Sequence, residues 1–355
     1  MAGGLLIGGA PAATLRAEPQ ADGTGFVEAT VLPGRGFMLL QAVMARPSGE
    51  RVEAIQSPTL EAAAAALNGG PDDFAGNGSF RFGGAILAPF ANRIRGRARD
   101  DAREIEAAID GRLVHLPRNW GGKAPGAEQY AMHGLILATP VPWTQPRPDR
   151  LQGVLEDVDF GGRWPGRARL AFEWRLEGGE LRLRVEARNL GPVPLPIGLG
   201  WHPYFRLPSG DRRQARLTVP ARQRTEVNDY DEVLPTGRIL DVAGTAYDFR
   251  GAGRALGDLY LDDCFTGLAA SGGSAVTEIL DPAAGLGLRI AAPCPPVRAI
   301  QVYAPPTDAF VVVEPQYNLA DPFGAEWPPG VDTGMVRLPP GATTLYEVAV
   351  TPFEA

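Results

Sequence analysis

The stretch ARLAFEWRLEGGELRLRVEARNL, residues 168–190, alternates apolar and polar residues on both sides of a central EGGE. Alternation with a period of two predicts a strand with one buried face and one solvent face. A Gly-Gly pair between two such strands predicts a tight hairpin. The arginines of this stretch occupy its polar positions, and we expect them on the solvent face of an antiparallel sheet.

Four more segments predict strands because Val, Ile, Tyr and Phe recur in them at a period of two: 286–294, 299–305, 309–316 and 343–353. The 45 Gly and 34 Pro residues divide the chain into short segments. Good helical character is confined to SPTLEAAAAALNGG, residues 57–70. We therefore expect an all-β fold, a single many-stranded antiparallel β-sandwich over residues 1–355 with few short helices. An irregular segment is expected at residues 1–24.

Charge and motif content argue against several classes of partner. The net charge is −7 and the sequence has no lysine/arginine cluster, so neither a nucleic acid nor an anionic membrane is expected as a partner. A run of about 18 apolar residues, as a membrane span needs, is absent from the sequence. So is a glycine-rich nucleotide motif followed by a helix. Cys264 and Cys294 form no CxxC motif, which favours a reducing compartment and the cytoplasm, although APAA near the N-terminus weakly resembles a secretory cleavage site.

The chain has only three histidines. His115, in RLVHLPRNW, falls in a strand pattern, and we expect it on a sheet face without a functional role. His133, in QYAMHGLIL, precedes a glycine that permits a tight turn or a close approach to a ligand. His202, in WHPYFRL, is held among aromatic residues and a proline. Taken alone, His133 and His202 are equally consistent with structural histidines and with acid/base or ligand-binding groups.

Charged residues occur in three apolar settings. Glu314 closes the hydrophobic strand FVVVEPQ, where partial burial would raise the pKa of its carboxyl towards neutrality; the alternative is a strand end that faces water. Asp262 and Asp263 are adjacent in LDDCF, so only one of them is expected to point inward. Arg93, in PFANRIRG, carries a rigid five-donor fork that suits recognition of hydroxyl groups or carboxylates.

These motifs also resemble those of a known family. PFANRIRG, HGL, WHPYF, LDDCF and VVVEPQ occur in this order, and in order and rough spacing they resemble the aldose 1-epimerases, the galactose mutarotase family. The resemblance runs over roughly residues 25–353 and implies a large antiparallel β-sandwich with an open cleft. Carried over by position, it implies Glu314 as general base and His202 as general acid. It implies that four further residues bind and orient the sugar: Arg93, Asn92, His133 and Asp262.

The resemblance also implies a reaction. Interconversion of two anomers requires a base for the proton of the C1 hydroxyl and an acid for the ring oxygen, and both groups need pKa values near the working pH. Nothing is oxidised or transferred, so the resemblance implies neither cofactor nor metal, and a small-molecule sugar as partner. The aromatics Trp201, Tyr204 and Phe205 would support the site or form an apolar wall for the sugar.

Three alternatives remain at this point. One is a β-sandwich lectin without turnover. Another is an epimerase of a phosphorylated or otherwise modified sugar, for which Arg95 and Arg97 would supply the additional basic charge. Departures from the family pattern, such as Asp263 where a histidine is common, leave the sugar open. The last alternative takes His133, His202, Asp262 and Glu314 as metal ligands, although no pair has HxH or HxxxH spacing. The sequence leaves the oligomeric state open.

Overall fold

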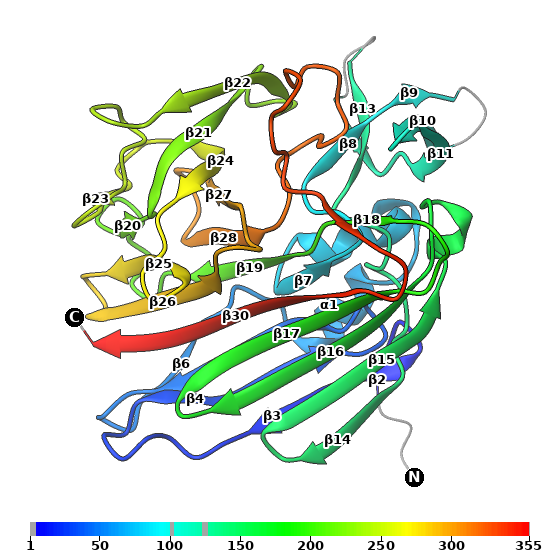
Figure 1. The fold of residues 1–355 in the computed structure, drawn as a ribbon. Coiled ribbons are helices and arrows are strands. Elements are labelled where there is room, and N and C mark those ends of the chain that lie inside the picture. The colour runs from blue at the N-terminus through cyan, green and yellow to red at the C-terminus, as the bar shows by residue number, and fades with distance from the viewer. Residues whose placement is uncertain (1–4, 100–102, 123–126, 355) are drawn as a thin grey trace.

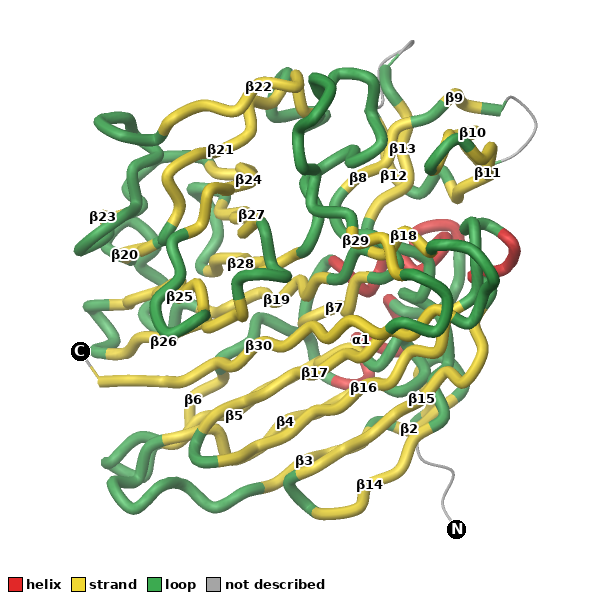
Figure 2. Tube along the Cα trace, viewed as in Figure 1, coloured by secondary structure: helices red, strands yellow, loops and turns green. Residues whose placement is uncertain are grey.

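The structure is a computed structural model that describes residues 5–99, 103–122 and 127–354. Two large antiparallel sheets dominate it, and Figure 1 shows the long strands of one sheet lying over strands of the other. One continuous set of buried apolar side chains comes from both sheets, including Phe37, Trp174 and Trp201. The expected all-β sandwich is therefore confirmed. Figure 2 shows that helices are confined to a few short segments.

The nine-stranded sheet carries the hairpin predicted from residues 168–190. Its turn residues Gly178 and Gly179 have φ values of 58° and 76°, which a two-residue hairpin turn of this hand requires. The arginines of the hairpin lie half-buried or exposed on the outer face. In spatial order the strands are β14 (Trp143–Arg147), β15 (Arg150–Val158), β16 (Ala168–Glu177), β17 (Glu180–Asn189), β30 (Thr343–Glu354), β26 (Leu286–Pro293), β25 (Ser274–Asp281), β20 (Arg216–Thr218) and β23 (Arg254–Ala255).

The eleven-stranded sheet contains two of the other predicted strands, β27 and β28, at its centre. In spatial order the strands are β22 (Pro235–Asp241), β21 (Ala221–Val227), β24 (Leu261–Leu268), β27 (Ala299–Ala304), β28 (Phe310–Gln316), β19 (Gly200–Arg206), β7 (Gly84–Leu87), β5 (Met38–Ala45), β4 (Gly25–Leu32) and β3 (Ala13–Arg16), with β6 (Arg51–Glu53) paired to β5. Segments far apart in the sequence thus become neighbours at the middle of this sheet.

Smaller sheets and short helices complete the fold. The small sheets are β1 (Leu6–Ile7) with β2 (Ala10–Pro11), β11 (Arg112–Pro117) with β10 (Glu104–Ile109) and β9 (Arg97–Ala98), β12 (Trp120–Gly121) with β13 (Gln129–Met132) and β8 (Arg93–Arg95), and β18 (Leu195–Ile197) with β29 (Val336–Leu338). Helical segments are α1 (Leu60–Ala66) and two 3₁₀ segments, Pro71–Phe80 and Phe160–Gly162. Within the described residues, no helix is long and apolar enough to cross a membrane.

Two expectations need correction. The segment 1–24 is irregular only in part: β3 pairs with β4 and buries Ala13 and Leu15 on alternate positions, whereas residues 17–24 form no strand or helix. Residues 1–4 lie outside the described part. The helix expected at 57–70 is shorter than its pattern: it begins after Thr59, whose hydroxyl accepts a hydrogen bond from the Ala62 amide, and it ends at Ala66.

Candidate active site

A pocket of about 450 Å³ lies over the central strands of the eleven-stranded sheet. Residues on β19 alternate between the two faces of the sheet, so Trp201 and Phe205 enter the core between the sheets while His202 and Tyr204 face the pocket. The strands β28, β27 and β24 belong to the same sheet (Figure 1), and they add further side chains to the pocket lining. All six residues expected at a sugar site line this pocket: Asn92, Arg93, His133, His202, Asp262 and Glu314.

Among these six residues, Glu314 and His202 form a buried pair. Glu314 Oε1 lies 3.4 Å from His202 Nε2, and the side chains are 2% and 7% exposed. Burial raises the pKa of Glu314 well above its usual 4.5; the charge of Asp262 adds to this shift and that of Arg93 opposes it. Burial lowers the pKa of His202 to about 4. Glu314 Oε2 and His202 Nδ1 have no hydrogen-bond partner among the described residues.

His133 follows β13 directly and has a left-handed backbone conformation, with φ of 62°. Asn119 fixes this strand end, because its side chain accepts a hydrogen bond from the Met132 amide and donates one to the Met132 carbonyl. The ring of His133 meets the ring of His202 edge-on at a centroid distance of 4.8 Å. Burial, followed by the neighbouring His202 and Arg93, lowers the pKa of His133 well below 6.5. Both histidines are therefore held neutral.

Four polar side chains close a hydrogen-bonded ring beside this pair. Arg93 donates to Asn92 Oδ1 at 2.8 Å, and Asn92 donates to Gln301 Oε1 at 3.0 Å. Gln301 donates to Asp262 Oδ1 at 2.6 Å, and Asp262 Oδ2 lies 3.5 Å from Arg93. Gln301 was missed in the sequence. The only signal for it is a single amide within the apolar strand AIQVYA.

The adjacent aspartates behave as their alternation predicts. Asp262 lines the pocket, whereas Asp263 does not and is fully buried on the other side of β24. His115 lies on β11, away from the pocket lining, as expected. Arg95 and Arg97 do not line the pocket either: Arg95 pairs with Glu326, and the exposed Arg97 pairs with Glu106.

Aromatic rings line much of the pocket. Of the three aromatics of the WHPYF motif, Tyr204 lines the pocket, while Trp201 and Phe205 belong to the core beneath it and support the strand that carries His202. The other aromatic lining residues share no motif in the sequence, because they come from six separate segments: Phe80, Trp120, Tyr230, Tyr260, Tyr303 and Phe310.

The side-chain atoms of His133, His202 and Glu314 that could bind a metal lie within 4.8 Å of one another. They would have to move closer together to coordinate one cation. Asp262, the fourth residue considered as a metal ligand, is engaged by Gln301 and Arg93 instead. His133, His202 and Glu314 are therefore the residues that would hold a metal in this pocket.

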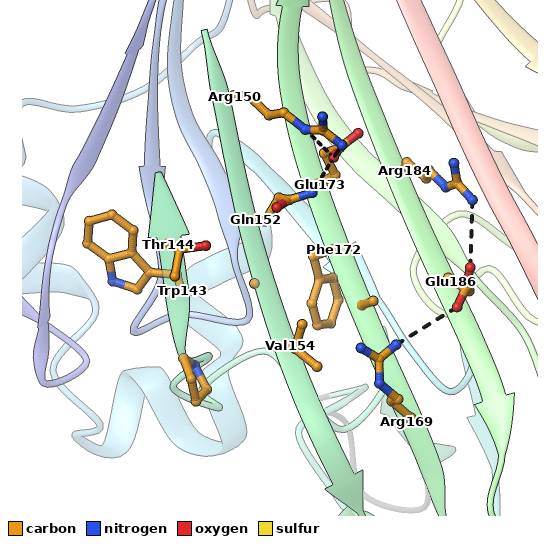
Figure 3. A pocket seen from close by; sticks show the side chains of 13 residues that line it. Trp143, Thr144, Arg150, Gln152, Val154, Arg169, Phe172, Glu173, Arg184 and Glu186 are labelled. Atoms are coloured by element: carbon orange, nitrogen blue, oxygen red, sulfur yellow. Dashed lines mark hydrogen bonds and ion pairs between the residues drawn. The ribbon is translucent and has the colours of Figure 1, made fainter. Parts of the chain in front are cut away.

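A second hollow, of about 570 Å³, lies on the outer face of β14–β17. Figure 3 shows that its charged groups are already matched: Arg150 and Gln152 point to Glu173, and Glu186 lies between Arg169 and Arg184. Because these carboxylates have partners, the hollow offers a ligand less than the pocket over the other sheet does, where buried polar atoms lack partners.

Comparison with curated proteins finds galactose mutarotases. The human protein is 27% identical over 186 residues, which are 50% of this chain and 49% of the human one. The bovine protein is 30% identical over 172 residues, 47% of this chain and 45% of the bovine one. The aligned part of the chain thus spans about half the length of these relatives.

Solved structures match over nearly the whole chain. A galactose mutarotase-like protein from Clostridium acetobutylicum has a TM-score of 0.71 at 16% identity and covers 94% of each chain. An aldose epimerase homologue from C. elegans has a TM-score of 0.69 at 18% identity and covers 97% of this chain and 99% of its own. At these identities the likeness shows the fold alone, a galactose mutarotase-like β-sandwich.

The family model described as aldose 1-epimerase matches residues 51–350. This range contains all five motifs, and the fold brings the six residues expected at the site into one pocket. The chain is a member of the aldose 1-epimerase family.

Proposed function

We propose that this protein interconverts the α and β anomers of a free aldose, with Glu314 as general base and His202 as general acid. The observation that carries the proposal is their buried contact, with 3.4 Å between Glu314 Oε1 and His202 Nε2. The two oxygens that exchange protons in this reaction, the C1 hydroxyl and the ring oxygen, are bonded to the same carbon. A base and an acid that each reach one of them must therefore be close neighbours.

The directions of the two pKa shifts favour a single proton on the pair, held by Glu314. Burial favours the protonated carboxyl of Glu314 and the neutral ring of His202. A C1 hydroxyl that donates to the unpartnered Glu314 Oε2 favours the carboxylate, so the proton of the pair moves to His202. Glu314 then takes the hydroxyl proton while His202 protonates the ring oxygen, and the C1–O5 bond breaks. The aldehyde rotates about C1–C2, and the ring closes with the roles reversed.

Arg93, Asn92, His133 and Asp262 would bind and orient the sugar in this proposal, with Gln301 as a fifth polar group. Arg93 Nε and His133 Nδ1 are buried without partners among the described residues. Buried polar groups are normally hydrogen-bonded, and sugar hydroxyls are both donors and acceptors. A polyhydroxylated ligand would therefore satisfy them.

The charge of the pocket lining supports a free sugar over a phosphorylated one. Among the residues that the structure describes, two arginines, Arg81 and Arg93, line the pocket, and Arg93 is engaged by Asp262. Four carboxylic acids line it as well: Asp231, Asp262, Asp308 and Glu314. A dianionic phosphate would meet more negative than positive charge. Arg95 and Arg97, the residues considered for that role, are paired elsewhere.

A carbohydrate-binding protein without turnover is the second candidate, because the same polar groups would hold a sugar. The buried Glu314 favours an enzyme, since a carboxyl held so far out of water is costly for a protein that only needs to bind. Perturbed acid/base groups of this kind are concentrated at catalytic sites.

Polarimetry on freshly dissolved α-D-glucose and α-D-galactose tests the proposal. The curated relatives carry the name galactose mutarotase, so galactose belongs in the first experiment. We expect wild type to speed mutarotation and Glu314→Gln to lose about 10²–10⁴-fold in kcat. His115→Ala, at a half-buried position of β11 outside the pocket lining, is the matched control and should retain wild-type rates. Binding of both sugars by a wild type that does not accelerate mutarotation would support the lectin instead.

A further inference from the structure

Behind the pocket lies a closed network of four side chains that the proposed reaction does not use. Asp263 is fully buried, and its Oδ1 accepts a hydrogen bond from Arg224 at 2.8 Å. Its Oδ2 accepts one from the Tyr230 hydroxyl at 3.0 Å. The hydroxyls of Tyr230 and Tyr247 lie 3.0 Å apart, and the Arg224 guanidinium stacks over the Tyr247 ring at 3.8 Å. The Tyr230 hydroxyl is thus bonded to two groups at once.

Tyr230 itself belongs to the pocket lining, although the residue is 37% exposed. An exposed tyrosine on a loop normally keeps its rotamer freedom. Here the hydroxyl is fixed to a buried ion pair on β21 and β24, so the ring is held at the mouth of the pocket. A wall that is ordered before the ligand arrives avoids the entropic cost of ordering it on binding.

The position of Tyr230 relative to the acid/base pair follows from a row of rings. From His202 the row passes through Tyr204, Phe310, Tyr303 and Tyr260 to Tyr230, with successive centroids 5.0–6.3 Å apart. All six rings line the pocket. Tyr230 ends this row at the opposite end from His202, and a sugar with C1 at His202 would therefore turn a part that lies away from C1 towards it.

We propose that Tyr230 is a specificity-determining residue that contacts the C4 side of the sugar, and that Asp263 and Arg224 are positioning residues that fix its ring. This inference rests on the proposed function, because it takes C1 to lie at Glu314 and His202. Carbon C4 lies across the pyranose ring from C1, and glucose and galactose differ only in their configuration there. Because the Tyr230 hydroxyl is used by Asp263 and Tyr247, its ring acts on the sugar as an apolar surface and selects by shape.

The test measures dissociation constants of D-glucose and D-galactose by calorimetry, since binding does not require turnover. Tyr230→Ala removes the wall, and we expect the ratio of the two constants to change at least about threefold. Tyr230→Phe and Asp263→Asn keep the ring and release it from its anchor. They should weaken the binding of the sugars about two- to tenfold and shift the ratio in the same direction.

Polarimetry on the same variants separates a binding role from a general structural one. We expect KM to rise while kcat at saturation stays within about twofold, since Glu314 and His202 are untouched. Asp248→Asn is the matched control: it breaks an exposed ion pair with Arg250 beside Tyr247 and leaves the Tyr230 anchor intact. Its constants should equal those of wild type.

The outcomes distinguish the two hypotheses. An unchanged glucose/galactose ratio in Tyr230→Ala overturns the specificity role. Unchanged affinity in both Tyr230→Phe and Asp263→Asn overturns the positioning role, and the first of these keeps the ion pair should the second fail to fold. A wild type that binds both sugars without turnover contradicts only the epimerase proposal. A wild type that binds neither sugar contradicts both.

Discussion

Gln301 Nε2 lies 2.6 Å from Asp262 Oδ1, and this contact orients the carboxylate that faces the pocket. The other end of the same amide accepts a hydrogen bond from Asn92 at 3.0 Å. Gln301 therefore connects a residue of the β7–β8 loop with one on β24, and it fixes its own amide orientation by doing so. Asp262 is left with Oδ2 3.5 Å from Arg93, a longer contact than a full ion pair makes.

Removing this amide should weaken sugar binding more than turnover. Gln301→Ala leaves Asp262 Oδ1 and the Asn92 amide without a partner in a buried site, which costs about 1–3 kcal/mol. We expect KM for the aldose to rise about tenfold or more with kcat changed little, because neither Glu314 nor His202 is touched. Steady-state polarimetry measures both constants. A KM equal to that of wild type would show that Gln301 has no part in holding the site.

Much of the fold follows from local patterns. The hairpin β16–β17 was predicted in full because its alternation and its Gly-Gly turn agree, and β26, β27, β28 and β30 were predicted from alternation alone. The N-terminal strand β3 was missed, since four residues give too short an alternation to recognise. Its burial depends on pairing with β4, which the sequence alone does not reveal.

The residues of the site also fall into two groups, those that the sequence predicts and those that it does not. The six expected residues were found because each belongs to a short motif that resembles the family pattern, and the structure places all six in the pocket. Gln301 and Tyr230 lie outside those motifs. Gln301 faces Asp262 because β24 and β27 are neighbours in the sheet, and Tyr230 reaches the pocket from a loop. Such contacts depend on which strands are adjacent, and local periodicity does not encode that order.

The buried carboxyl of Glu314 should make stability depend on pH. Its folded pKa lies well above the ordinary 4.5 because burial disfavours the carboxylate, so the folded state binds the proton of this carboxyl more tightly than the unfolded state does. Its contribution to stability is fully present below about pH 4.5 and is lost as the pH rises through the folded pKa. The Glu314→Gln variant has no titrating carboxyl at this position, so it does not lose this stability as the pH rises. We expect its Tm to exceed that of wild type by a margin that grows from pH 4.5 to pH 8, as thermal unfolding at several pH values will measure.

The same pair should set the pH dependence of kcat/KM. Turnover needs one proton on Glu314 and His202 together, and burial lowers the pKa of His202 to about 4. Protonation of the neutral ring on the acid side adds a second proton and stops the base from acting. We expect activity to remain near its plateau at pH 5 and to fall towards about pH 4, below the ordinary histidine range. A limb near pH 6.5 would contradict the burial of His202 as the cause.

Gly134, which follows His133, should tolerate no side chain. Its φ is 87°, and a Cβ there would lie 2.2 Å from the Ala88 carbonyl oxygen, a backbone atom that has little room to move. Gly134→Ala therefore combines a left-handed conformation, about 1 kcal/mol, with overpacking of about 1–3 kcal/mol. The matched control is Gly210→Ala, with φ of 75° and no atom within 4 Å of the added Cβ. Thermal unfolding should show a much larger fall in Tm for Gly134→Ala, and polarimetry a loss of activity, because the shift displaces His133. Equal Tm values for the two variants would contradict the close approach.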